Sequence, residues 1–255
     1  CDRRQRQMCI RDRVICDWLE GNSLSKLPVV ILREARASLF LWHSEGKKER
    51  IKMGKSKLLK KIHSAAINYQ KHLAGRTFLY VYEDRYVEIV FKSSSFLHLT
   101  GVKTNLKAKG FFLHAKKKKG LRPSEVMFDK THPYDLAERK INHLENLYKV
   151  TCTNVMIATE IVTITAIYKI GVTNFQFVLL CGPNRDKTGT LIDDCLVPYS
   201  FRVEDISTSR FEELYEVKYI FSKQTNEKSY STITYKSEDS ISDLPDNIRE
   251  KVKNI

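Results

Sequence analysis

The chain has 255 residues, of which 42% are hydrophobic and 29% are charged, proportions typical of a soluble globular protein rather than a fibrous or disordered one. Lysine and arginine number 44 against 30 aspartates and glutamates, so the formal net charge is +14. This excess favours a polyanionic partner, because each Lys or Arg placed against a phosphate releases condensed counterions. No apolar run approaches about 18 residues, so we expect no membrane span and no membrane partner.

The first fifty residues differ in character from the rest of the chain. Residues 3–12 resemble translated sequencing adapter and show neither a helix nor a strand period. Residues 47–52 are compatible with a purine-rich ribosome-binding site just before Met53. We therefore expect residues 1–52 to be an artefactual or non-domain extension and residues 53–255 to form a single domain. Residues 1–52 hold 12 basic and 7 acidic residues, which leaves 32 and 23 in the remainder, so the basic excess persists.

The cysteines predict neither disulfides nor a metal site. Six are present without paired spacing, and three of them, Cys152, Cys181 and Cys195, follow residue 53. A scattered, odd set is typical of free thiols in a reducing compartment, so we expect a cytoplasmic protein.

The predicted elements after Met53 begin with helices and a hairpin. Apolar residues at spacings of three and four predict a helix over 55–74 that ends at Gly75. Residues 77–82 and 86–91 are β-branched and aromatic and predict a hairpin. A short helical turn over 93–99 should close at Gly101, and a helix capped by Thr104 should run to Lys117.

The second half is predicted to be mostly strands. An amphipathic helix over 135–148 comes first. Short polar links then join apolar segments in a pattern that favours an antiparallel meander, and a last short helix is expected over 246–252. The fold class is therefore α+β, with N-terminal helices packed on an antiparallel sheet or meander. The strand candidates are 154–160, 164–171, 174–180, 191–204, 215–222 and 229–235.

One motif points to a different enzyme class. Residues 186–190, Asp-Lys-Thr-Gly-Thr, have the letters of the phosphorylated-aspartate signature of cation-pumping ATPases. That chemistry needs a magnesium site and many membrane helices, which this sequence lacks. We interpret residues 182–189 as a polar hairpin loop between two apolar strands.

A possible acid–base centre lies around residue 98. His98 and Thr100 stand beside Gly101, and Lys103 and Lys107 follow them. Histidine is the side chain best suited to move a proton near neutral pH, and a nearby lysine offsets phosphate charge. A histidine that only caps the preceding turn is an equally open interpretation. The remaining histidines after Met53 are interpreted as structural or solvated, including His132 in an evident turn.

A second cluster lies at the end of a predicted strand. With period two, Tyr199 and Phe201 share one strand face while Ser200 and Arg202 share the other. A Ser–Arg pair on one face can bind a phosphate, the guanidinium in bidentate fashion, and Lys169 joins them if the register permits. An exposed polar strand face explains the same pattern equally well.

Several short motifs resemble those of one known family. They are Phe-Lys at 91–92, His-Leu-Thr-Gly-Val-Lys-Thr-Asn-Leu at 98–106, Phe-Asp-Lys at 128–130, Tyr-Asp-Leu-Ala at 134–137, Lys-Ile-Gly-Val-Thr-Asn at 169–174 and Pro-Tyr-Ser-Phe-Arg-Val at 198–203. With them, the chain from Ser64 onward resembles the fourth of the phage-associated barnase–EndoU–colicin–RelE-like nuclease families. The resemblance implies helices packed on a four-stranded antiparallel core, metal-independent RNase activity without a cofactor, and a phage or mobile-element origin.

The expected mechanism is internal attack by a ribose 2′-hydroxyl on the adjacent phosphate. His98 is the expected acid or base, and its role requires that it meet Arg202 in one phosphate-sized hollow. Lys169 would stabilise the phosphate with Arg202, while Ser200 and Thr100 would position oxygens. The expected RNA contacts are Lys103, Lys107, Lys116, Lys117 and Tyr199, although Lys116 and Lys117 also fit a solvated face and Tyr199 also fits core burial.

The expected partner is RNA, with tRNA among the candidates, together with an immunity or antitoxin protein. The RNase hypothesis includes a role as a toxin, and two alternatives to an RNase stay open at this point. One is a non-catalytic nucleic-acid-binding module of the same fold, and the other is a phage structural or interaction protein.

Overall fold

The computed structural model describes residues 54–162, 167–174, 176–203, 211–237 and 244–252. The expectations for residues 1–52 and for a start at Met53 lie outside the described residues. Within the described ranges, none of the helices has the length and apolar character needed to cross a membrane.

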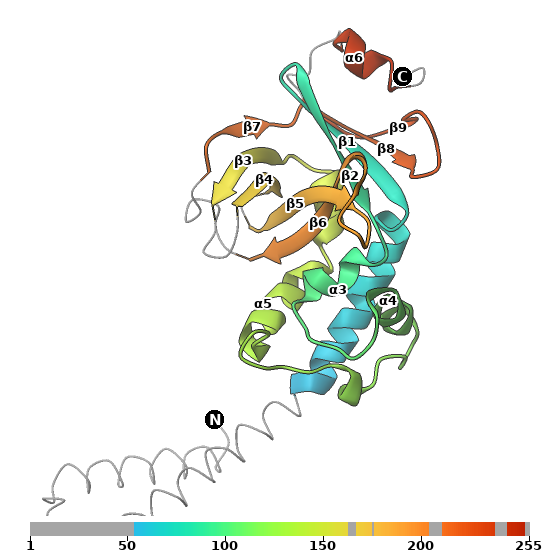
Figure 1. Ribbon diagram of the computed structural model, residues 1–255, viewed down its shortest axis with the longest axis vertical. Helices are drawn as coiled ribbons and strands as arrows, with labels where there is room; N and C mark the ends of the chain where they lie inside the picture. Colours follow the sequence, from blue (N-terminus) through green and yellow to red (C-terminus); the bar gives the residue numbers. More distant parts are fainter. Residues whose placement is uncertain (1–53, 163–166, 175, 204–210, 238–243, 253–255) are drawn as a thin grey trace, which may run out of the picture. The chain divides into compact units, whose positions relative to one another are not determined.

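The first helix, α3 (Ser95–Thr100), α4 (Ala108–Lys116) and α5 (Tyr134–Leu144) gather on one side of the sheet (Figure 1). The short helix α6 (Asp246–Arg249) packs elsewhere, in a small cluster with residues of β1 (Arg76–Tyr82) and β8 (Tyr219–Gln224). The first helix, over residues 54–72, buries the predicted apolar stripe, including Leu58, Ile62 and Tyr69. The next helix after the short turn begins at Ala108 and not at Thr104, because the Thr104 hydroxyl accepts a hydrogen bond from the Leu106 N–H and closes a turn instead. Short 3-10 turns lie at Pro123–Glu125 and Leu147–Thr151.

Nine strands form one sheet in the described part of the chain, in the order β7-β3-β4-β5-β6-β2-β1-β8-β9. The β1–β2 hairpin and the β3–β6 meander confirm the predicted order, and the α+β fold class is confirmed. The neighbours β2 and β6 run parallel, through Ile89 and Leu196, so the sheet is mixed and larger than a four-stranded antiparallel core. The strands are β1 (Arg76–Tyr82), β2 (Arg85–Phe91), β3 (Met156–Val162), β4 (Ile167–Thr173), β5 (Val178–Arg185), β6 (Leu191–Arg202), β7 (Leu214–Glu216), β8 (Tyr219–Gln224) and β9 (Thr232–Lys236).

The strand predicted over 215–222 is two strands. β7 pairs with β3 at one edge of the sheet, whereas β8 pairs with β1 near the other. Val217 lies between them, fully buried, and its N–H donates to the carbonyl of Val155. One apolar run of the sequence therefore contributes two strands, which pair in distant parts of the sheet.

The two faces of the meander pack in different apolar clusters. Leu179 and Phe201 belong to the large cluster between helices and sheet. Val178 and Leu180, the neighbours of Leu179, belong to a small cluster with Ala158 and Ile161. This alternation follows from the period of two along a strand, and it identifies the side of the sheet on which each β6 side chain lies.

Helix α3 is anchored between the sheet and the other helices. It contacts β6 on one side and α4 and α5 on the other (Figure 1). Phe96 is fully buried, with its ring centroid 5.2 Å from those of both Tyr69 and Phe112. Gly101 ends α3 as predicted, in the left-handed conformation (φ 70°) that glycine adopts without steric cost.

Residues 186–190 form the turn of the β5–β6 hairpin. Oδ1 of Asp186 accepts hydrogen bonds from the N–H groups of Thr188 at 2.8 Å and Thr190 at 3.0 Å. Hydrogen bonds from the Thr188 hydroxyl and these N–H groups hold the pKa of Asp186 below its ordinary value. The interpretation as a polar hairpin turn is confirmed for these residues, whereas residues 182–185, which were predicted to belong to the loop, continue strand β5.

Candidate functional site

Two hollows adjoin the exposed side of α3, and His98 and Tyr199 line both of them. The first hollow has a volume of about 380 Å³ and no described carboxylate in its lining. Its polar lining comes from the end of α3, the loop after it, the turn before α5, and α5 itself. These residues are His98, Lys103, Thr104, Thr131, His132 and Lys140.

The second hollow has a volume of about 500 Å³ and is likewise lined by no described carboxylate. Its walls come from the β2–α3 connection, α3, β4, the end of β5 and the middle of β6. The polar and aromatic residues of these walls are Lys92, Ser94, Ser95, His98, Tyr168, Asn184, Arg185 and Tyr199.

His98 is exposed on the last turn of α3. Two residues earlier, Phe96 is buried in the core, and its packing fixes the backbone of the helix that carries the imidazole. Thr100, on the same helix, is fully buried, and its hydroxyl donates to the carbonyl of Leu97 at 2.7 Å. The Thr100 hydroxyl thus stabilises the end of α3 and lies outside the lining of either hollow.

Tyr199 is 42% exposed, so the alternative that this residue is buried in the core is wrong. The β5–β6 register shifts between Leu180, which pairs with Ser200, and Cys181, which pairs with Pro198, so Tyr199 lies at a bulge and has no partner in this ladder. Its hydroxyl donates to the carbonyl of Pro183 at 2.6 Å, and its ring covers Gly182, where a Cβ would overlap it. The ring is therefore held open to solvent between the two hollows.

The turn that carries His132 is organised by Asp129. Oδ1 of Asp129 accepts hydrogen bonds from the N–H groups of Thr131 at 2.9 Å and His132 at 2.8 Å, and Oδ2 forms an ion pair with Lys103 at 2.7 Å. The hydrogen bonds from Lys103 and Thr131, and then from the His132 N–H, hold the pKa of Asp129 well below its ordinary value.

The same contacts orient the His132 ring. The Thr131 hydroxyl donates to Oδ1 of Asp129 at 2.7 Å, so at the 2.9 Å contact with Thr131 Oγ1 it is Nδ1 of His132 that donates. Nε2 is then the ring nitrogen left to exchange a proton. The structural interpretation of His132 was incomplete, because the residue both belongs to the turn and lines the first hollow. The Asp-x-x-His spacing at 129–132 was the available signal.

Lys92 and Asn184 are held together in the lining of the second hollow. Nζ of Lys92 donates to Oδ1 of Asn184, and Nδ2 of Asn184 donates to Oδ1 of Asp193 at 2.8 Å. Asn184 is only 2% exposed. Arg185, next to it, donates to the carbonyl of Gly189 at 2.7 Å. Sequence reasoning missed both cations as site residues, although Lys92 lies in one of the family-like motifs.

The register does not bring Arg202 to His98. Ser200 and Arg202 pair with Leu180 and Val178, which belong to the small cluster of the sheet, whereas α3 packs in the large one. Neither hollow is lined by Ser200 or Arg202. Lys169 is exposed on β4 and is also absent from both linings.

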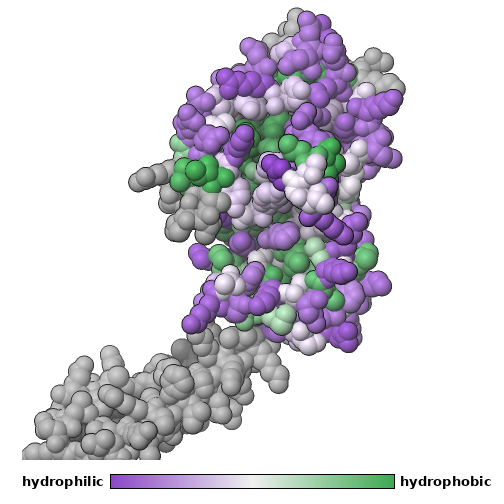
Figure 2. Space-filling view, viewed as in Figure 1, coloured by the Kyte–Doolittle hydropathy of each residue, from purple (hydrophilic) through white to green (hydrophobic). Residues whose placement is uncertain are grey.

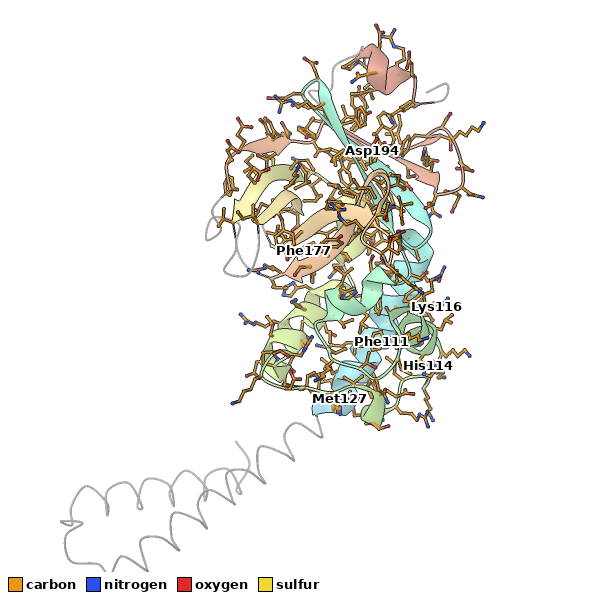
Figure 3. All side chains as sticks on the ribbon, in the orientation of Figure 1. Phe111, His114, Lys116, Met127, Phe177 and Asp194 are labelled. Carbon is orange, nitrogen blue, oxygen red and sulfur yellow. The ribbon has the colours of Figure 1, made fainter. Side chains whose placement is uncertain are left out.

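The lysines that were predicted to bind RNA do not lie together in one site. Lys103 lines the first hollow, but Lys107 precedes α4 and Lys116 and Lys117 stand at its other end. Figure 3 shows Lys116 on the outer side of α4. Its Nζ donates to Oε1 of Gln70 at 2.8 Å and lies 5.1 Å from the Phe112 ring centroid. Lys116 is half-buried, and these contacts hold it against Gln70 of the first helix and the Phe112 ring of its own helix.

The outer surface is mostly hydrophilic in the view of Figure 2, with separate apolar patches. Across the described ranges, no three His, Cys, Asp or Glu side chains are grouped as a metal site.

Comparison with known proteins gives one family. The family model described as phage-Barnase-EndoU-ColicinE5/D-RelE like nuclease4 matches residues 61–239, which include all the residues that line the two hollows. No curated protein and no solved structure matches the chain.

Proposed function

Since this chain belongs to the phage-Barnase-EndoU-ColicinE5/D-RelE like nuclease 4 family, we propose that it is a metal-independent endoribonuclease that cleaves RNA by 2′-hydroxyl attack. The observation that carries the proposal is the first hollow, whose lining combines two imidazoles, two lysines and no carboxylate. Imidazoles move protons near neutral pH, and ammonium groups stabilise charge on a phosphorane.

In the proposed reaction, His98 takes the proton from the ribose 2′-hydroxyl, and the resulting oxygen attacks the adjacent phosphorus. His132 gives a proton from Nε2 to the departing 5′-oxygen, so the P–O5′ bond breaks and a 2′,3′-cyclic phosphate forms. The assignment follows from the contacts of His132. An imidazolium there forms an ion pair with Asp129 across the 3.5 Å between Nδ1 and Oδ1. Lys103 and Lys140 provide the cations.

The phosphate-stabilising roles of Arg202 and Lys169 and the positioning role of Ser200 stay predictions. The phage or mobile-element origin, a toxin role in the host cytoplasm, and an immunity or antitoxin partner belong to the same proposal. They are supported by the family description alone. tRNA stays one candidate among RNA substrates.

The deciding experiment incubates the purified protein with RNA in the presence of EDTA. We expect cleavage with 2′,3′-cyclic phosphate ends, and no cleavage of DNA of the same sequence, because DNA lacks the attacking hydroxyl. Cleavage that EDTA abolishes, or that leaves 5′-phosphates, would rule out this mechanism. Intact RNA that is bound in a salt-sensitive manner would favour the non-catalytic binding module instead.

Replacing Asp129 by asparagine should lower kcat/KM for RNA cleavage by about 10- to 100-fold, because the turn that places His132 loses its charged anchor. The folded-state pKa of Asp129 is lowered below its ordinary value of about 3.9. The stabilisation that its ionised carboxylate gives the folded protein is therefore fully present above that ordinary value, and it is lost as the pH falls through the folded-state pKa. The carboxylate is therefore ionised throughout the pH range of the assay.

The matched control is Asp84→Asn, at an exposed site in the β1–β2 turn. A positioning role predicts that Asp129→Asn alters the alkaline limb of the pH–rate profile, which reports the acid. A loss of rate at all pH values equally, accompanied by a lowered melting temperature, would indicate a purely structural role.

A further inference from the structure

We propose that the second hollow is a subsite for the phosphate next to the scissile one. The preferred substrate is then an RNA strand with at least two consecutive phosphodiesters. The inference rests on the proposed function, since the scissile phosphate is placed at His98, which lines both hollows. A strand that reacts at His98 continues directly into the second hollow.

The charges of the second hollow are not neutralised by carboxylates. Among the described residues, neither Lys92 nor Arg185 forms an ion pair with a carboxylate; Lys92 bonds to the neutral amide of Asn184, and Arg185 bonds to a backbone carbonyl. In the first hollow, by contrast, Lys103 is paired with Asp129 at 2.7 Å. An additional phosphate therefore meets two uncompensated cations in the second hollow, and charge-assisted hydrogen bonds to phosphate are the strong kind.

The Lys92 ammonium is also held in place. Its backbone carbonyl accepts a hydrogen bond from the buried Tyr69 hydroxyl at 2.9 Å, directly after β2. The Asn184 amide that receives its Nζ is itself fixed by Asp193 on the far side. Asn184 is only 2% exposed, so the acceptor that holds the Lys92 ammonium is itself fixed. Lys92 therefore loses little side-chain freedom when a phosphate binds.

Aromatic rings complete the subsite. Tyr168 and Tyr199 both line the second hollow, and aromatic side chains bind unpaired bases by stacking without requiring a particular sequence. The combination of uncompensated cations and aromatic rings matches a single strand rather than a free inorganic anion.

The first test compares a dinucleoside monophosphate with a trinucleoside diphosphate that has the same scissile step. We expect the wild-type protein to cleave the longer substrate with a kcat/KM greater by about tenfold or more. In Lys92→Ala/Arg185→Ala this ratio should fall to near one. The control Lys71→Ala/Lys228→Ala, which removes equal charge at exposed sites, should keep the wild-type ratio. If the alanine variant does not fold, Lys92→Gln/Arg185→Gln removes the two charges but retains more of each side chain and a polar end, and the same fall in the ratio is expected.

The second test does not depend on cleavage. The affinity of a fluorescent single-stranded deoxyoligonucleotide is measured against salt concentration. The Lys92/Arg185 variant should reduce the slope of log K against log salt by about one relative to the control variant. An unchanged ratio together with an unchanged slope overturns the subsite even if RNA is cleaved. A reduced slope without any RNA cleavage keeps the subsite and overturns the proposed function.

Discussion

His98→Ala should lower kcat/KM for RNA cleavage by about 10²- to 10⁴-fold, the usual contribution of one general acid or base. His98 is exposed on α3, so its truncation removes the imidazole without opening a cavity in the core. The melting temperature should therefore stay at the wild-type value. His143→Ala, on α5 and in the lining of neither hollow, is the matched control and should be fully active.

The pH dependence separates the two histidines. The wild-type kcat/KM should be bell-shaped, because one imidazole must be neutral and the other protonated. His98→Ala should lose the acid limb and His132→Ala the alkaline limb. The double variant should be little worse than either single one, since an acid and a base that act in one step are not additive.

The opposite outcome is equally specific. If His98→Ala retains near wild-type activity while Arg202→Ala abolishes it, the centre lies on the face of the sheet that carries Arg202. The first hollow would then have no catalytic role.

Local patterns in the sequence were sufficient to predict the helices and strands around His98. The stripe of the first helix, the β1–β2 hairpin and the glycine that ends α3 are all local features, and each was confirmed. A period of two also placed Phe201 and Arg202 on opposite faces of β6. The prediction that His98 is a site residue rests only on its neighbours and the family-like motif, and the structure adds that His98 lines both hollows.

The rest of the site depends on contacts between distant segments, which a single sequence does not reveal. Lys92 meets Asn184 across 92 positions of the chain, and Lys103 meets Asp129 across 26. The exposure of Tyr199 goes with a bulge that is set by the pairing of β5 with β6, which the residues around it in the sequence do not reveal. The expected meeting of His98 with Arg202 would have required the opposite strand face.

The largest effect on stability should come from Phe96→Ala. The ring is fully buried, and deletion of a buried phenyl group typically costs about 3–5 kcal/mol through lost transfer free energy and the cavity left behind. Domains of this size are stable by about 5–15 kcal/mol, so a large part of the stability would be lost. Urea unfolding measures the change, and Leu113→Ala, at a residue that is 53% exposed, should stay within about 0.5 kcal/mol of wild type.

Phe96 also links the core to the chemistry. Helix α3 has six residues, and His98 stands two positions after Phe96, so a change in the packing of the ring should move the imidazole. Phe96→Leu, which keeps much of the apolar volume, should remain folded at the assay temperature yet cleave RNA more slowly than wild type, with KM less affected than kcat. If Phe96→Leu is destabilised but keeps its full kcat, the position of His98 does not depend on this packing, and the imidazole would have to be held by the lining of the hollows instead.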